Sequence, residues 1–427
     1  MAIQDTLPSD PIRVRRRDPH SLVEVRAVGG VDAGRIWSLG MGTHTLGPAP
    51  DSAVHLRGAH AGRPGVRLTV TAGGEAWLAI PDPRPENSAL PPEPGVPTLR
   101  TLRPMEPAGT PWAFPQDAAS AAQELRWPEG AQLSIYGTRL SVARIRPVRS
   151  ADRAPASDLE RVERDALFER AVRCAEVPDP AALAADVTGR RATVGWRKPG
   201  MDGFLRLRLG SADGGSRTER WILPGLPCAV DLADAGILGV ASVNLEAARA
   251  LARWLVVQAA THCAPDDLGI RILADPSAGR SWEWAAKLPH GSRQGEAPAA
   301  TDPRSVGRNI AELAAELAAR AELPPSEDRP SRALLAVIDR ASMLREVDGV
   351  AQILGRGPEF GIYAICVDTI AAIVPECRVV GRTTADELAL SVRRQPERDR
   401  GGITPDLVGT EWCTRVAGTL ASAGSTG

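Results

Sequence analysis

Short segments in which apolar and polar residues alternate, separated by glycine and proline, fill the first third of the chain. They read VEVRAV, RIWSL, THTLG, VRLTV, AWLAI, QLSIYG and RLSVARI, between residues 21 and 148. Closely spaced strands with turn signals between them and almost no helical period predict a small all-β sandwich. A proline-rich stretch at 81–127 interrupts the pattern, and we interpret it as a long irregular excursion between strands.

The pattern changes after residue 148. Residues 149–157 are small, polar and charged, as is typical of a linker, and a helix is predicted from 158 to about 175. Beyond it, continuous apolar runs such as GILGVA, LGIRILA, LLAVID and GIYAICVD alternate with helical segments at 245–262, 305–323 and 347–354. Runs of this kind predict a mainly parallel sheet with helices on both faces, which is an α/β three-layer domain.

These patterns predict a multidomain chain, and its 427 residues are too many for one ordinary core. The predicted parts are a disordered arm (1–20), an all-β sandwich (21–148), a linker and helix (149–176), an α/β domain (177–421) and a disordered tail (422–427). The basic cluster at 13–17 is interpreted as part of a solvated arm.

Charge and cysteine content argue against several classes of protein. Lys+Arg number 51 and Asp+Glu 52, so the net charge of -1 gives no global field for binding nucleic acid. The six cysteines show no Cys-x-x-Cys pair and no metal-ligand spacing, so we expect reduced thiols and no metal site. No run approaches the roughly 20 apolar residues of a membrane span, and the N-terminus lacks a signal-peptide core. We therefore expect no membrane span and a cytoplasmic location.

Several short motifs follow one another in the second half of the chain. They are Gly195–Gly200, Asp202–Arg208, Val230–Leu232, Gly236–Val240, Ala250–Leu255, Asp267–Leu268, Trp282–Trp284 and Leu288–His290. In this order they resemble the N-terminal, pre-motor region of the FtsK/SpoIIIE-type ATPase of type VII secretion systems, over residues 166–421. The resemblance implies that the sandwich is a degenerate forkhead-associated (FHA)-like domain. The family's membrane helices and tandem motors are missing from this sequence, which argues against membrane anchoring and substrate pulling.

The segment after the GILGV run stands where a P-loop would. A P-loop needs G-x-x-x-x-G-K-[ST], because backbone amides cradle phosphate, lysine neutralises it and the hydroxyl holds magnesium. Starting at Gly239, this chain offers Asn244, Leu245 and Glu246 at the diagnostic positions. We interpret Asn244 as a helix N-cap and the segment as a degenerate, P-loop-like turn.

The run ending in Asp339 resembles the strand that supplies an acidic magnesium ligand, but Arg340 follows where a second carboxylate would be needed. Asp339 is then expected to cap the following segment rather than bind a metal. Because both halves of the site are incomplete, we expect no ATP hydrolysis, no other enzymatic activity and no cofactor. A nucleotide-sensing pseudo-ATPase remains an alternative.

FHA domains bind phosphothreonine through a set of loop residues, and the predicted sandwich retains part of that set. Pro48 stands where that pattern has the principal arginine, so the candidate phosphopeptide loop consists of Arg57, His60, Arg63 and Asn87. The competing interpretation is a structural or protein-docking sandwich. A phosphothreonine-binding signalling module is therefore kept as an alternative function.

A third candidate site is the loop that carries Trp282, Trp284 and His290. Clustered aromatic side chains on a loop can anchor a protein partner, but the favoured interpretation is that these tryptophans pin the loop to its own domain. The sequence as a whole predicts a non-catalytic adaptor that acts through protein–protein contacts near a type VII-like secretion system. Its expected partners are secretion-machinery components or a phosphoprotein.

Overall fold

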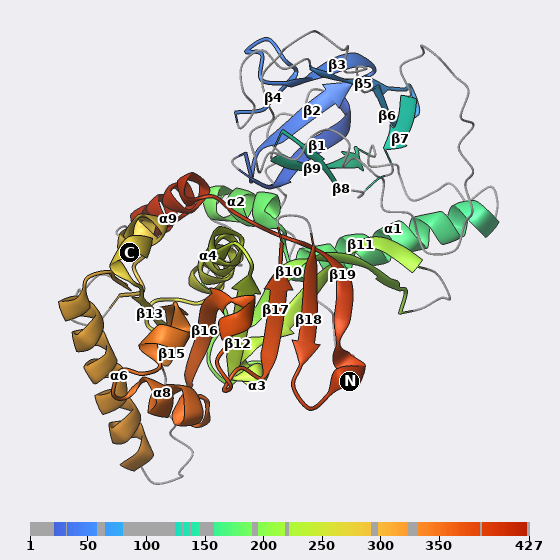
Figure 1. The fold of residues 1–427 in the computed structure, drawn as a ribbon. Helices are drawn as coiled ribbons and strands as arrows, with labels where there is room; N and C mark the ends of the chain where they lie inside the picture. The colour runs from blue at the N-terminus through green and yellow to red at the C-terminus, as the bar shows by residue number, and fades with distance from the viewer. Residues whose placement is uncertain are drawn as a thin grey trace, which may run out of the picture.

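Two units make up the part of the chain that the computed structural model describes, an all-β unit followed by an α/β unit (Figure 1). The described residues are 21–30, 32–57, 65–79, 124–127, 129, 132–136, 138–145, 158–189, 195–217, 222–291, 298–322, 332–384 and 387–424. The predicted arm at 1–20, the linker at 149–157 and most of the proline-rich excursion lie outside them.

The first unit consists of two sheets. One has the strand order β2-β1-β9-β8 and the other β4-β3-β5-β6-β7, and every pairing is antiparallel except that of β3 with β4. The bounds are β1 Ser21–Gly29, β2 Ile36–Gly40, β3 Gly42–Gly47, β4 Val54–His55, β5 Val66–Val70, β6 Ala76–Ala79, β7 Glu124–Trp127, β8 Gln132–Ile135 and β9 Thr138–Arg144.

Alternation along the strands builds the core of this unit. In β1 the side chains of Val23, Val25 and Ala27 are buried while the intervening Glu24 and Arg26 are partly exposed, because successive residues point to opposite faces of a strand. They share one core with Leu46 and Leu68 of the other sheet. The all-β prediction for 21–148 agrees with this architecture, and the relationship to FHA domains remains a prediction.

The second unit is built on one large sheet of order β11-β10-β19-β18-β17-β12-β16-β15-β13-β14. The stretch from β17 to β14 is parallel, whereas β11, β10, β19 and β18 extend it by antiparallel pairing. The bounds are β10 Arg206–Gly215, β11 Ile222–Asp231, β12 Ile237–Ser242, β13 Leu268–Leu273, β14 Ala299–Ala300, β15 Ala333–Asp339, β16 Ile362–Thr369, β17 Val379–Thr383, β18 Leu388–Val392 and β19 Arg400–Pro405. The expectation of a mainly parallel sheet therefore holds for only one half of it.

Helices cover both faces of the parallel half, as predicted. Buried residues of α4 and α9 pack on one face, and those of α6 and α8 pack on the other. The helix bounds are α1 Asp158–Glu176, α2 Pro180–Gly189, α3 Leu232–Ala235, α4 Leu245–His262, α5 Gly279–Trp282, α6 Pro303–Glu322, α7 Ala341–Leu344, α8 Val350–Arg356 and α9 Thr410–Gly424, with 3-10 turns η3 Glu283–Lys287 and η5 Ile370–Ala372 among the connections. The tail expected to be disordered from 422 begins instead as the last turn of α9.

One ion pair crosses the junction between the two units, and a second, more deeply buried pair lies inside the α/β unit. Arg26 of β1 donates from Nη2 to Oδ1 of Asp179, just before α2, at 3.1 Å. Arg208 of β10 donates from Nε to Oδ2 of Asp406, just after β19, at 2.6 Å, and both side chains are almost fully buried. Burial acts to raise the pKa of Asp179, but the charges of Arg26 and Arg208 outweigh it and hold that pKa below its usual value. Burial raises the pKa of Asp406 in spite of the Arg208 charge.

Candidate functional site

The candidate nucleotide site lies where the neighbouring strands β12, β16 and β15 end at their carboxyl edge, the usual place for ligands in open α/β sheets. Strand β12 runs to Ser242 and α4 begins at Leu245, so Val243 and Asn244 alone connect them. Gly239 lies inside the strand. The prediction of a P-loop-like turn starting at Gly239 is therefore wrong, because too few residues remain to wrap around a phosphate.

Gly239 has a packing role instead. A Cβ atom placed there would lie 3.1 Å from Sγ and 3.3 Å from Cβ of Cys377, so the glycine permits close contact between β12 and the segment before β17. Close packing in the core therefore explains why a glycine occupies this position, which resembles the first glycine of a phosphate-binding motif.

The three residues at the diagnostic P-loop positions are all engaged in folding the chain. Asn244 is the N-cap of α4, as predicted, and its side chain accepts a hydrogen bond from the Glu246 amide at 3.0 Å. Leu245 packs against the hydrophobic core. The Glu246 carboxylate accepts from the buried Arg253 at 2.6 Å, and Arg253 also donates to the Val408 carbonyl. This arrangement presents a carboxylate where a P-loop presents a hydroxyl.

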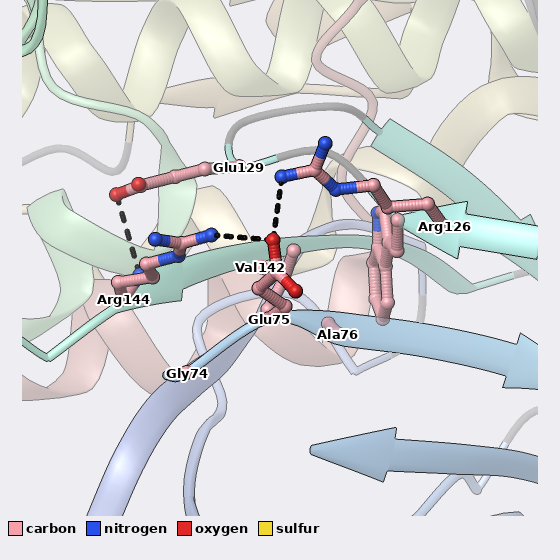
Figure 2. Close-up of a pocket in the computed structure, with 8 residues that line it drawn as sticks. Gly74, Glu75, Ala76, Arg126, Glu129, Val142 and Arg144 are labelled. Carbon is pink, nitrogen blue, oxygen red and sulfur yellow. Dashed lines mark hydrogen bonds and ion pairs between the residues drawn. The ribbon is translucent and has the colours of Figure 1, made fainter. Parts of the chain in front are cut away.

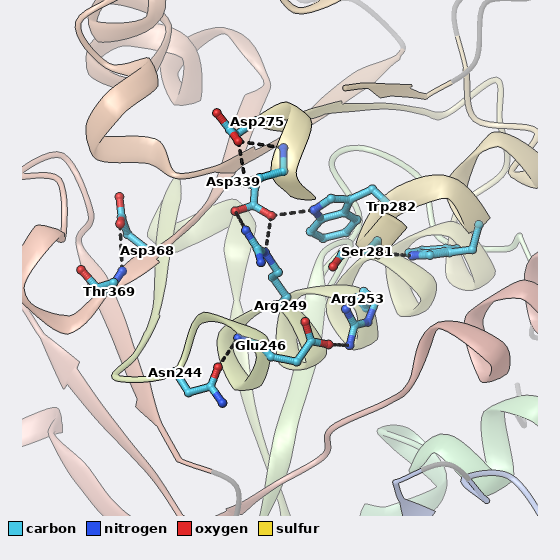
Figure 3. A network of polar contacts seen from close by, with 12 residues as sticks. Asn244, Glu246, Arg249, Arg253, Asp275, Ser281, Trp282, Asp339, Asp368 and Thr369 are labelled. Atoms are coloured by element: carbon cyan, nitrogen blue, oxygen red, sulfur yellow. Dashed lines mark hydrogen bonds and ion pairs between the residues drawn. The ribbon is translucent and has the colours of Figure 1, made fainter. Parts of the chain in front are cut away.

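Asp339, the last residue of β15, is fully buried and bound on both carboxylate oxygens (Figure 3). Arg249 of α4 donates to it twice, from Nε to Oδ2 at 2.8 Å and from Nη2 to Oδ1 at 3.1 Å. Trp282 of α5 donates from Nε1 to Oδ2 at 2.7 Å. Burial acts to lower the pKa of Arg249, but the hydrogen bonds and charge of Asp339 raise it above its ordinary value. Both carboxylate oxygens of Asp339 are thus occupied by donors of the chain itself.

The expectation that Asp339 caps the following segment is wrong, since Asp368 of β16 does so. Its Oδ2 accepts from the Ser342 amide of α7 at 2.7 Å, and its Oδ1 accepts from the Thr369 amide at 2.8 Å. Arg340 adopts a left-handed backbone conformation with φ 65° at the start of α7. Each buried acid at this edge is therefore already satisfied by groups of the chain itself.

The residues proposed for the partner-binding loop are buried. Trp282 is bonded to Asp339, and Trp284 donates to the Ser281 carbonyl at 3.1 Å. His290 is 1% exposed, its Nε2 lies 2.9 Å from the Cys263 carbonyl oxygen, and burial lowers its pKa to about 4. Buried side chains cannot act as exposed anchors, so the loop is pinned to its own domain, which was the competing interpretation.

Arg57 is the one member of the candidate phosphopeptide loop that belongs to the described residues. Arg57 is exposed, and its Nη1 lies 3.4 Å from Oε1 of Glu411 at the start of α9. His60, Arg63 and Asn87 lie outside the described residues. Arg57 therefore faces the α/β unit across the junction.

A small cavity lies at another part of the β unit (Figure 2). Glu75 accepts from Arg126 at 2.8 Å and pairs with Arg144 at 3.6 Å, while Glu129 accepts from the Arg144 amide. The enclosed space is about 20 Å³, which holds one or two water molecules. It is too small for a phosphopeptide.

Neither a metal-binding cluster nor a membrane-spanning helix is found in the described residues. Among them, no group of three or more His, Cys, Asp or Glu side chains is placed to hold a metal ion. Within the same ranges, no helix is long and apolar enough to cross a membrane.

Comparisons with known proteins find similarity in structure alone. No family model matches the sequence, and no curated protein matches it significantly. The cytoplasmic domain of the type VII secretion ATPase EccC of Thermomonospora curvata is similar with a TM-score of 0.41 at 18% identity, covering 54% of this chain and 32% of that one. EssC (ATPases 2 and 3) of Geobacillus thermodenitrificans gives 0.40 at 12%, covering 54% and 51%. The conjugation coupling protein TcpA of pCW3 gives 0.35 at 12%, covering 50% and 69%. This chain thus spans about a third of the first structure and about half of the second.

Sequence reasoning missed Arg249 and Asp368. Arg249 lies five residues after Asn244 in a helix that reads simply as amphipathic, and its partner is 90 positions away. Asp368 ends an apolar strand run, as Asp339 does, and that shared position is the one signal that could have found it.

Proposed function

We propose that this chain is a non-catalytic adaptor in which a degenerate P-loop-type α/β domain acts through protein contacts and does not hydrolyse ATP. The observation that carries the proposal is the buried Arg249–Asp339 ion pair, which fills the magnesium position from within. The two-residue connection between β12 and α4, which leaves no phosphate loop, supports it independently.

The chemistry of phosphoryl transfer explains why these features matter. Catalysis there consists of positioning the phosphates and neutralising the charge that develops on them. In this chain Glu246 adds negative charge at the phosphate end, and Arg249 would have to leave Asp339 before magnesium could bind. Opening such a buried pair costs about 3–5 kcal/mol, which magnesium-ATP binding would have to supply first.

The order of motifs from Gly195 to His290 supports a place for this adaptor near a type VII-like secretion system. In that setting the chain would contribute contacts to secretion-machinery components rather than mechanical work. The nucleotide-sensing alternative differs in one measurable respect, since it requires ATP to bind.

The test is a calorimetric titration of the purified chain with ATP and magnesium, paired with a phosphate-release assay. We expect no binding tighter than about 100 μM, or roughly -5.5 kcal/mol, and no phosphate release. The matched variant is Asp339→Asn, which keeps the shape of the side chain and removes its charge. Tight binding without turnover would favour the nucleotide-sensing alternative, and turnover that Asp339→Asn abolishes would sink the proposal.

A further inference from the structure

Exposed apolar side chains gather at the carboxyl edge of the parallel sheet, beside the closed Asp339 site. Val243 follows β12 and is 82% exposed, and Ile370 follows β16 and is 39% exposed. Met343 and Val347 follow β15 and are 55% and 41% exposed. We call these four side chains the carboxyl-edge surface. A monomer gains nothing from exposing them, so the surface needs an explanation.

The sheet register brings these residues together. Strands β12 and β16 are parallel neighbours in which Ser242 pairs with Thr369, so the next residues, Val243 and Ile370, follow adjacent strand ends. Helix α7, which carries Met343, is held over the end of β16 by the hydrogen bond from the Ser342 amide to Asp368. The surface therefore spans three neighbouring strand ends, where an active P-loop enzyme would bind its nucleotide.

The charges around this surface are mainly negative. Glu346 and Asp348 flank Val347 and are both exposed. Arg345 offsets them only in part, because it forms a two-pronged ion pair with Glu376 at 2.7 and 2.9 Å while its Nη1 lies 3.9 Å from Oε1 of Glu346.

Two further cations at this edge are balanced by acids. Arg340, whose Nη2 donates to Sδ of Met343 at 3.4 Å, lies near Asp275, and Arg253 is paired with Glu246. What remains uncompensated is acidic, which disfavours nucleotides and other anions and favours cations.

We propose that the carboxyl-edge surface binds a segment of a partner protein in which apolar residues stand next to arginine or lysine. The apolar residues would cover Val243, Ile370 and Met343, and the cations would meet Glu346 and Asp348. The inference rests on the proposed adaptor function and names the surface and the partner chemistry through which it works. Apolar anchors supply most of the binding energy at such interfaces, and charges at the rim set the partner choice and association rate.

The test measures fluorescence anisotropy of a short labelled peptide in which valine and leucine alternate with arginine, titrated with the full chain. Two matched peptides carry glutamate for arginine or serine for the apolar residues. We expect the first peptide to bind at least about tenfold more tightly than either, with affinity that falls as salt rises.

Substitutions in and around the carboxyl-edge surface test whether the peptide binds there. Val243→Ser with Ile370→Ser should weaken peptide binding at least about tenfold, and Glu346→Lys with Asp348→Lys should weaken it and flatten its salt dependence. All four positions are exposed, so folding should be unaffected, and circular dichroism checks this. The control is Phe168→Ser with Val172→Ser, an exposed apolar pair on α1, which should leave binding unchanged.

Three outcomes would overturn the inference: equal binding to all three peptides, edge variants that bind as the parent does, or self-association of the chain that the Val243/Ile370 pair abolishes. The last would mean that a second copy occupies the surface. Adding ATP separates the two proposals. If ATP binds and displaces the peptide, the adaptor proposal fails; if neither binds, the present inference alone fails.

Discussion

Arg249 of α4 and Asp339 of β15 form a two-pronged ion pair, with Asp339 fully buried and Arg249 13% exposed. The pair joins the helix to the carboxyl end of the strand. Trp282 donates to the same carboxylate, so the three side chains form an internal clamp.

Removing the cation of this clamp should be costly. Arg249→Met leaves the Asp339 charge buried without its partner, so we expect the free energy of unfolding of the α/β unit to fall by about 3–5 kcal/mol. Urea denaturation followed by tryptophan fluorescence measures this. The double variant Arg249→Met with Asp339→Asn should recover part of the loss, because no uncompensated charge remains. Equal stability of the single and double variants would contradict the clamp.

The Trp282 indole contributes through its N–H group. Trp282→Phe keeps an aromatic ring in the core but removes the donor to the charged Asp339, so we expect a loss of about 1.5–3 kcal/mol. Trp284→Phe is the matched control, because its indole donates to a neutral carbonyl oxygen and should cost about 0.5–1.5 kcal/mol. The same denaturation curves report both, and a control that loses more than Trp282→Phe would refute the ranking.

Sequence patterns predict the two units of this protein but miss particular strands and contacts. Alternation in β1 and continuous apolar runs in β12, β13, β15 and β16 correctly predict an all-β unit and an α/β unit, because burial of one or both faces of a strand determines which of its residues are apolar. The antiparallel strands β18 and β19 escape notice, since β18 is only five residues long and β19 begins with Arg400, Gly401 and Gly402, which are exposed. The Arg249–Asp339 pair cannot be read from spacing, because its partners meet only through the packing of α4 on the sheet.

The N-cap of α4 at Asn244 can be tested by substitution. Asn244→Ala removes the acceptor for the Glu246 amide and should lower the free energy of unfolding by about 1 kcal/mol. Asn244→Asp keeps an acceptor and adds negative charge at a helix N-terminus, so it should retain or raise stability. Thermal unfolding of the two variants side by side checks this, and an Ala variant as stable as the Asp variant would rule out the cap.

Stability should fall as the solution is acidified from pH 6.5 towards pH 4, in part because of His290. Burial lowers the pKa of this imidazole to about 4, from 6.5 in an unfolded chain. In that window the unfolded state therefore binds a proton that the folded state does not. The free energy of unfolding then drops with pH by up to about 3 kcal/mol from this group. His290→Gln, which keeps a donor for the Cys263 carbonyl, should flatten the slope between pH 6.5 and 4 in urea denaturation. An unchanged slope would assign the acid sensitivity to other groups.

The last prediction compares two ion pairs that differ in burial, Arg208–Asp406 inside the α/β unit and Arg26–Asp179 between the two units. Arg208 is 3% exposed and Asp406 fully buried, whereas Arg26 and Asp179 are 25% and 14% exposed. Arg208→Met leaves Asp406 buried without its partner and removes a charge that also lowers the pKa of Asp179. We therefore expect the free energy of unfolding to fall by about 3–5 kcal/mol. Arg26→Met should cost about 1 kcal/mol or less, because water screens the partly exposed pair. Arg208 also donates from Nη1 to the Val177 carbonyl at 3.1 Å, so limited proteolysis near residue 177 should become faster in Arg208→Met and stay near the parent rate in Arg26→Met. The reverse order would contradict the ranking of the two pairs by burial.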